Sequence, residues 1–189
     1  DAGVSLPKTQ RAQARKLTER IAELGLQFDR NIREDTTQTA FAADELRGVP
    51  DTVWKDAKRD AQGRVLLGLD EPSYLPVIQS AENPAARERM WRAKTNEGGD
   101  ANLKLLGDIA QARRQYARLF GLASYDDFLL RRRMVGSTSH AQAFLADVKA
   151  AVRDAELREL SELRQAKARH LGQPLEAVAL EHWDIAFYT

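Results

Sequence analysis

Two long stretches of apolar residues, spaced three and four apart, most constrain what this chain can fold into. The first runs from Pro7 to about Arg33, and the second from about Ser139 to Leu171. Because an α-helix has 3.6 residues per turn, this spacing places the apolar side chains on one face of each helix. At 1.5 Å of rise per residue, each helix is roughly 40 to 50 Å long and needs partners to cover that face. The fold class we expect is mainly α.

The region 38–70 departs from the helical pattern and predicts a small β element. β-Branched and aromatic residues favour a strand around Thr37–Phe41, and "RVLLGLD" favours a second one. Between them we expect a helix that starts at Asp51 and reaches about Ala61. The prolines Pro72 and Pro76 predict that "EPSYLPVI" is not a regular helix throughout.

Helical patterns return after Asn83, which is a favourable N-terminal cap, as is Ser124 further on. Between these caps, one apolar face is expected from the spacing of Leu103, Leu106, Ala110, Ala117 and Phe120. The chain is thus expected to be a series of amphipathic helices with one small β insertion.

Charge and composition exclude several classes of function. The 29 basic and 28 acidic residues alternate within the same segments, whereas nucleic-acid binding needs a concentrated basic face. The chain has no cysteine, which excludes disulfides, thiolate metal sites and a cysteine nucleophile. No apolar run approaches the roughly 20 residues that cross a bilayer. We expect no nucleic-acid partner and no membrane partner. The expected location is the cytoplasm, and a periplasmic or secreted location stays open.

The three histidines do not have the spacing of a zinc peptidase. Such an enzyme shows H-E-x-x-H, which places two ligands one helical turn apart. His140, His170 and His182 contain no such pair. We interpret them as a residue at a helix start, one at a helix C-terminus and one in a loop.

Other groups that resemble chemical sites have simpler structural interpretations. We expect Arg131–Arg133 to form a solvated face paired with nearby acids, and Ser137–Ser139 to cap a helix. The acidic pairs Glu34–Asp35 and Asp126–Asp127 fit helix termini, and Trp91 fits a core anchor. The residues therefore predict no catalytic, cofactor-binding or metal-binding site in this chain.

Five stretches, taken in order along the chain, resemble motifs of one family. They are "LQFDRNIREDTT", "DELRGVP", "LGLDEPSYLPVIQSAENPAARERMWRA", "RRQYARLFGLASYDDFLLRRRMVGS" and "HWDIAFYT". Together they are similar to the thimet oligopeptidase family of zinc metallopeptidases, which includes thimet oligopeptidase, neurolysin, oligopeptidase A and the bacterial dipeptidyl carboxypeptidases. One departure is Phe187, which stands where the family's Trp-Asp-x-x-Tyr-Tyr motif has its first tyrosine.

This resemblance implies a fragment of a longer enzyme. The family's zinc-binding and catalytic residues lie C-terminal to the Trp-Asp motif, so we expect zinc in the parent enzyme, none bound by this chain, and no activity of this chain alone. Residues 1–136 are expected to form a helical segment of the N-terminal, non-catalytic lobe with the small β insertion. Residues 137–189 are expected to form the long helix and the start of the segment leading into the catalytic half. The implied partners are that missing half and short peptides, which enter the parent's deep channel.

A different class of function is compatible with the same helices. A stand-alone helical interaction module would present the apolar faces of residues 7–33 and 139–171 to a partner protein. The natural stop codon separates the two hypotheses, because a chain that truly ends near Thr189 favours the interaction module.

Overall fold

The computed structural model describes residue 3 and residues 5–189, and it divides into two compact units. Unit 1 contains the described residues up to Asp35 together with Gly98–Val152. Unit 2 contains Thr36–Glu97 and Arg153–Thr189. The mainly α fold class is confirmed, since helices dominate and β structure among the described residues is limited to one small sheet.

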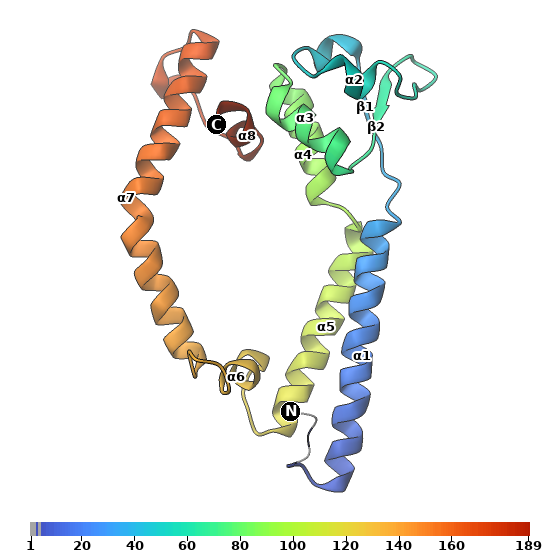
Figure 1. The fold of residues 1–189 in the computed structure, drawn as a ribbon, viewed down its shortest axis with the longest axis vertical. Helices are drawn as coiled ribbons and strands as arrows, with labels where there is room; N and C mark the ends of the chain where they lie inside the picture. The colour runs from blue at the N-terminus through green and yellow to red at the C-terminus, as the bar shows by residue number, and fades with distance from the viewer. Residues whose placement is uncertain (1–2, 4) are drawn as a thin grey trace. The chain divides into compact units, whose positions relative to one another are not determined.

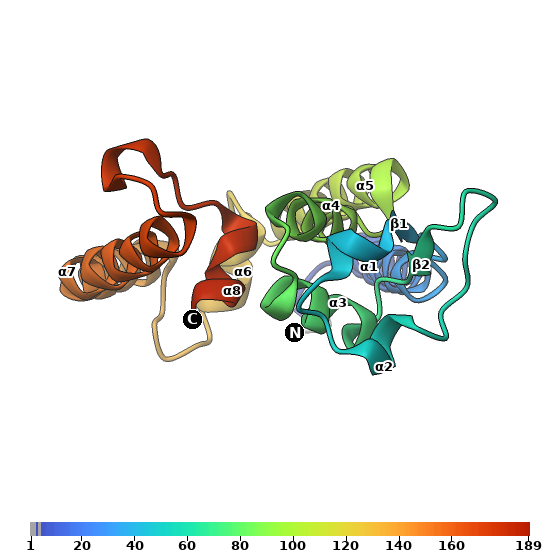
Figure 2. The ribbon, with the colours of Figure 1, turned by 90° about the horizontal axis from the view of Figure 1, so that it is seen from above.

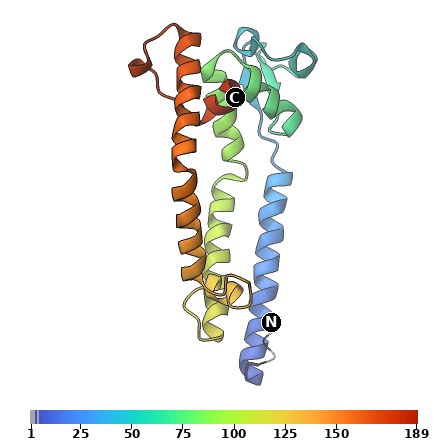
Figure 3. The same ribbon diagram turned by 60° about the vertical axis from the view of Figure 1, so that its left-hand side comes forward.

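Unit 1 is built on two long antiparallel helices, α1 (Lys8–Arg33) and α5 (Gly99–Leu119). They lie side by side in two views (Figures 1 and 3), and they contact each other along their length. Asn102 of α5 is 4% exposed and donates to the carbonyl of Phe28, while its own side-chain oxygen accepts from Asn31. Just after α1, the carboxylate of Asp35 accepts from the N–H of Gly98, which directly precedes α5. This bond joins the C-terminal end of α1 to the N-terminal end of α5.

The face of α5 that packs matches the predicted one only in part: Ala117 and Phe120 pack, but the first half of the predicted stripe does not. Leu103 and Leu106 are more than half exposed, whereas Asn102, Ile109 and Tyr116 are buried. The buried positions are seven residues apart, which is two helical turns. Because Asn102 is polar, apolar spacing alone does not identify the first half of the face that packs.

An aromatic cluster joins the end of α5 to the short helix α6 (Tyr125–Leu130). The Phe128 ring lies edge-on to Tyr116, with centroids 4.9 Å apart, and 4.8 Å from the Phe120 ring. Ser124 caps α6 as predicted: its hydroxyl accepts from the N–H of Asp127, and the Asp127 carboxylate accepts from Ser124 in return.

Unit 2 has its core between a two-stranded sheet and two helices (Figure 2). Strands β1 (Thr39–Phe41) and β2 (Val65–Leu67) pair antiparallel, with Ala40 opposite Leu66. The 3₁₀ helix η1 (Ala43–Leu46) and the helices α3 (Glu71–Ser80) and α4 (Pro84–Thr95) complete this region. Its buried residues are Phe41, Leu46, Val49, Val65, Leu67, Leu69, Val77, Ile78, Ala81, Ala86 and Met90.

The helix predicted to start at Asp51 is much shorter than expected. Helix α2 spans only Asp51–Trp54. The chain beyond it turns to run along β2, where the carbonyl of Lys58 accepts from the N–H of Leu66. These backbone bonds to β2 replace the helical bonds that the local pattern predicted.

The prediction that "EPSYLPVI" is not regularly helical was also wrong. Helix α3 is continuous over Glu71–Ser80 with Pro76 inside it. Pro72 falls in the first turn, where a missing N–H is harmless. Pro76 removes one bond within the helix, but burial of the adjacent Val77 and Ile78 holds the helix against the core.

The last part of the chain contains the longest helix, α7 (Thr138–Leu171), close to its predicted bounds. It is followed by the 3₁₀ helices η2 (Leu175–Ala177) and η3 (His182–Asp184) and by helix α8 (Ile185–Tyr188). Within unit 2, η3 contacts α4 and α8 contacts α3. Across the residues that the structure describes, no helix is both long and apolar enough to span a membrane.

Candidate functional site

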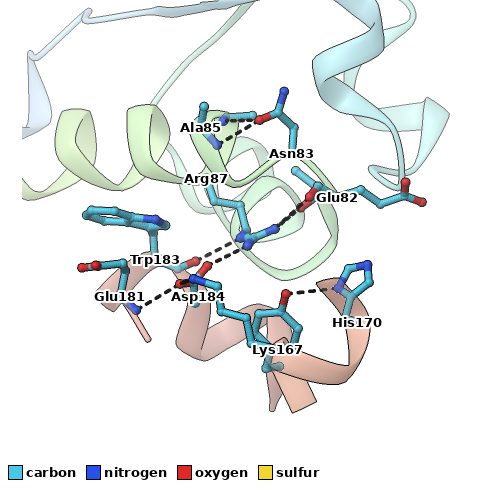
Figure 4. Close-up of polar contacts among 12 residues, drawn as sticks. Glu82, Asn83, Ala85, Arg87, Lys167, His170, Glu181, Trp183 and Asp184 are labelled. Carbon is cyan, nitrogen blue, oxygen red and sulfur yellow. Dashed lines mark hydrogen bonds and ion pairs between the residues drawn. The ribbon is translucent and has the colours of Figure 1, made fainter. Parts of the chain in front are cut away.

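The polar centre of unit 2 is built around Arg87, a fully buried arginine on α4. Helix α4 begins where the Asn83 side chain caps the N–H groups of Ala85 and Ala86. Arg87 lies one turn before the core residue Met90, on the same face of α4, and its side chain is only 1% exposed. Its guanidinium donates to the carbonyls of Ala81 at 2.6 Å and Glu82 at 3.3 Å (Figure 4).

Asp184 is the anion of this centre, and it comes from the other end of the sequence. One carboxylate oxygen accepts from Arg87 Nη2 at 2.7 Å, and the other accepts from Lys167 Nζ at 2.6 Å (Figure 4). The second oxygen also accepts from the N–H of Glu181 at 3.0 Å, which shapes the turn that starts η3. Asp184 is fully buried, and its carboxylate therefore joins α4, α7 and η3 in one cluster.

Aromatic rings close the cluster around the arginine. The Phe187 ring centroid lies 4.1 Å from the Arg87 guanidinium carbon, a cation–π distance. The Tyr188 hydroxyl lies 3.1 Å from His170 Nδ1, and the His170 ring stacks on Phe187. A phenylalanine at position 187, where the family motif has tyrosine, therefore keeps its ring contact with the cation.

The electrostatics hold Asp184 in its charged form. Burial by itself raises the pKa of a carboxyl, but the hydrogen bonds from Lys167 and Arg87 outweigh that effect and lower the pKa of Asp184 below its ordinary value of 3.8. A carboxylate bonded to two cations and a backbone N–H has no room for a substrate. This cluster is suited to holding segments together and not to acid–base chemistry.

The three histidines lie in different settings. His140 is at the start of α7, where its backbone N–H donates to the Ser137 hydroxyl. His170 lies in the last turn of α7, and His182 stacks on Trp91 with ring centroids 5.5 Å apart. Within the described part of the chain, no group of three or more His, Asp or Glu side chains is placed to hold a metal ion.

Asp127 and Ser137 have the helix-terminal roles expected of them. Asp127 accepts from the Ser124 hydroxyl at 2.9 Å and from the Thr138 hydroxyl at 2.6 Å, so it ties the start of α6 to the start of α7. The Thr138 and Ser124 bonds lower the pKa of Asp127. Ser137 caps α7 through the N–H of His140, as predicted.

Arg131 and Trp91 make contacts through aromatic faces. The Arg131 guanidinium carbon lies 4.3 Å from the centroid of the Phe128 ring. Trp91 packs against the core of unit 2 as an anchor, and the centroids of the Trp91 and Trp183 rings lie 5.7 Å apart.

Sequence reasoning missed the cluster of Arg87, Asp184 and Lys167. The sequence patterns gave no indication that Asp184 has cationic partners. One signal was present: Arg87 lies between Ala86 and Met90, on the core-facing side of α4. A charged residue at a core-facing position needs a buried counter-ion, but its location 97 residues further on is a property of the tertiary fold.

Comparison with known proteins decides the family. The profile of peptidase family M3 matches residues 77–189, more than half of the chain and the whole of the α4, α7 and η3 cluster. The chain belongs to peptidase family M3. The resemblance to the thimet oligopeptidase family is therefore confirmed.

Relatives in family M3 align with nearly the whole of this chain. Oligopeptidase A of Escherichia coli (strain K12) is 30% identical, over 100% of this chain and 29% of its own length. Two proteins of Arabidopsis thaliana are 27% identical: "Probable thimet oligopeptidase", over 92% of this chain and 24% of its own length, and "Probable cytosolic oligopeptidase A", over 100% and 29%. The chain thus spans less than a third of these M3 relatives.

Proposed function

We propose that this chain is part of a zinc-dependent oligopeptidase that hydrolyses short peptides, and that it is inactive on its own. The observation that carries the proposal is the M3 match over residues 77–189, in a chain that spans 29% of E. coli oligopeptidase A. On this proposal residues 1–136 belong to the non-catalytic lobe, and residues 137–189 lead into the catalytic half. The proposed location is the cytoplasm.

The exposed apolar face of α7 supports the proposal that a partner segment is missing from this chain. Leu145 and Val152, on the apolar stripe of this helix, are 64% and 50% exposed, and Phe144 and Val148 beside them are exposed as well. Helix α7 is exposed on nearly all sides from Gln142 to Glu162. A lone helix is marginal in water and gains most of its stability from packing, so this face fits a covering segment in the proposed catalytic half.

The residues described here do not fit the zinc of such an enzyme. No suitable ligand group is formed among them, and His170 and His182 are engaged in ring contacts. Zinc in a peptidase activates a bound water for attack on the peptide carbonyl. We assign the metal to the catalytic half and derive no step through it for this chain.

Two measurements test the proposal. Sequencing the gene past the codon for Thr189 is expected to reveal H-E-x-x-H within a few hundred codons, and an in-frame stop directly after Thr189 would overturn the proposed parent enzyme. The isolated chain is expected not to hydrolyse a quenched fluorescent peptide in the presence of zinc. Turnover that a chelator abolishes would place the active site in this chain.

The exposed α7 face also favours a second candidate, a stand-alone helical interaction module. In that case the covering partner is a separate protein, and the natural reading frame ends near Thr189. The same gene sequence distinguishes this candidate from the oligopeptidase.

A further inference from the structure

A groove beside strand β1 is separate from the Arg87–Asp184 cluster, and nothing in the proposed function uses it. It encloses about 660 Å³ and lies wholly within the Thr36–Glu97 part of unit 2. One wall is the backbone of the β1 segment, and the other includes Arg89 and Ala93, one turn apart on α4. The residues that line it are Thr37, Gln38, Thr39, Ala40, Ala42, Glu45, Arg64, Arg89 and Ala93.

β1 presents a partly open backbone edge to this groove. In an antiparallel pair, alternate residues direct their N–H and C=O groups to the neighbouring strand and away from it. The carbonyl of Ala40 accepts from Arg89 Nη1 at 2.8 Å, and the N–H of Ala42 donates to Glu45 Oε2 at 2.9 Å, so the even-numbered residues face away from β2. The backbone groups of Gln38 and the N–H of Ala40 therefore lie on the groove side of β1.

β2 offers no equivalent edge. Its outer side is covered by residues 58–60, because the Leu66 N–H donates to the Lys58 carbonyl and Val65 bridges to Arg59. In the described part of the chain, the sheet has two strands, so β1 is where a third strand can add. An edge strand facing a helix across a groove is the arrangement that binds extended peptides by strand addition.

Polar groups in the groove indicate the chemistry of the occupant. Thr39 is 6% exposed, and its hydroxyl has no hydrogen-bond partner among the described residues. Arg89 is held by the Glu45 carboxylate at 2.7 Å, whereas Arg64 is 52% exposed and is the lining cation left for a ligand. Asp60 bonds to Arg64 Nε but lies outside the groove lining. The lining thus favours a ligand that combines a peptide backbone with a negative charge.

We propose that this groove binds an extended peptide segment bearing a carboxylate, which adds to β1 as a third strand. The peptide's backbone pairs with Gln38 and with the N–H of Ala40, and its carboxylate faces Arg64. This site is a binding site without chemistry of its own, and it does not depend on the presence of a catalytic half.

Binding of labelled pentapeptides to the complete 189-residue chain tests the proposal. The first peptide has Val and Thr residues around a central Glu, with both ends blocked; the second has Gln in place of Glu; and the third has Gln and a free C-terminal carboxylate. We expect the first or the third to bind more tightly than the second in fluorescence anisotropy, which also identifies the source of the carboxylate. Bound peptide is expected to shift the amide resonances of Gln38 and Ala40 in NMR spectra. Equal affinity for all three peptides, or shifts elsewhere only, would overturn the proposal.

Variants give an independent readout. Arg64→Ala is expected to weaken binding of the charged peptide about two- to fivefold, the range of an exposed ion pair. Arg59→Ala, which removes an arginine from the covered side of β2, is the matched control and is expected to leave binding unchanged. Ala40→Pro removes an N–H that β2 does not use and is expected to weaken binding about two- to tenfold, the value of one hydrogen bond. If Ala40→Pro does not fold, the comparison of Arg64→Ala with Arg59→Ala tests the proposal. Equal losses of peptide affinity in these two variants would contradict it.

Discussion

At the scale of single residues, removal of Asp184 is expected to cost unit 2 more stability than removal of a residue from an exposed ion pair. Its two cationic partners, Arg87 and Lys167, are 1% and 13% exposed, so removal of the anion leaves their charges with little access to water. A surface pair such as Asp51 with Lys55, each about 60% exposed, is solvated whether or not the pair forms.

The substitution Asp184→Ala is therefore expected to lower the free energy of unfolding by about 3 to 5 kcal/mol, because it breaks a buried charge cluster on one side only. The measurement is urea unfolding monitored by circular dichroism. The matched control, Asp51→Ala, is expected to cost less than about 1 kcal/mol. Similar losses in the two variants would contradict the structural role of Asp184.

The pH dependence of unfolding provides a separate test. The pKa of Asp184 is lowered in the folded state, so its contribution is present above 3.8, the ordinary value, and is lost as the pH falls through the folded pKa. Asn cannot ionise, and the difference in unfolding free energy between the natural chain and Asp184→Asn is therefore expected to shrink from pH 7 to pH 3. A difference that stays constant over this range would show that the charge of Asp184 is not what stabilises the cluster.

At the scale of elements, sequence patterns predicted those helices whose bounds are set by residues within the helix or directly beside it. α4 has its asparagine cap at the expected position, and α7 has its long periodic stripe. The errors arose where distant residues decide. α2 ends early because residues 58–60 bond to β2, and α3 tolerates Pro76 because its apolar residues are buried against the core. The predicted absence of site residues stays a prediction, and the cluster at Asp184 needed the fold to bring its members together.

The turn at Gly48 is one place where an element junction depends on a single residue. Gly48 has a φ of 90°, and a Cβ there would lie 2.2 Å from the backbone carbonyl oxygen of Ser80, at the end of α3. We expect Gly48→Ala to destabilise the fold by about 3 kcal/mol, since it combines a strained φ with a clash against backbone.

Gly63 is a matched control for that substitution. Its φ is 77°, but no atom lies within 4 Å of a Cβ placed there. Gly63→Ala is expected to cost only the conformational strain, about 1 kcal/mol. Thermal unfolding of both variants measures the difference, and equal shifts in Tm would show that the contact with Ser80 does not matter.

At the scale of the whole molecule, the exposed apolar face of α7 predicts how the isolated chain behaves. Contiguous apolar surface of this kind drives association when its partner is absent. We expect sedimentation velocity to show self-association that increases with protein concentration. The double variant Leu145→Gln with Val152→Gln is expected to reduce it.

A control pair separates this face from general apolar exposure. Leu103 and Leu106 are also more than half exposed, but they lie on α5. Replacing both with Gln is expected to leave the association of the chain largely intact. A strictly monomeric natural chain, or equal loss in both double variants, would contradict a specific role for the α7 face.

The discontinuous make-up of unit 2 has a consequence for the timing of folding during synthesis. Arg87 leaves the ribosome 97 residues before Asp184, its counter-ion. At roughly 5 to 20 residues per second, about 5 to 20 seconds separate the two. Throughout that interval the helix that carries Arg87 can form, but the arginine has no anion to meet in the core. Folding of unit 2 is thus completed only after its C-terminal segment has been made, whereas α1 and α5 can pair well before then.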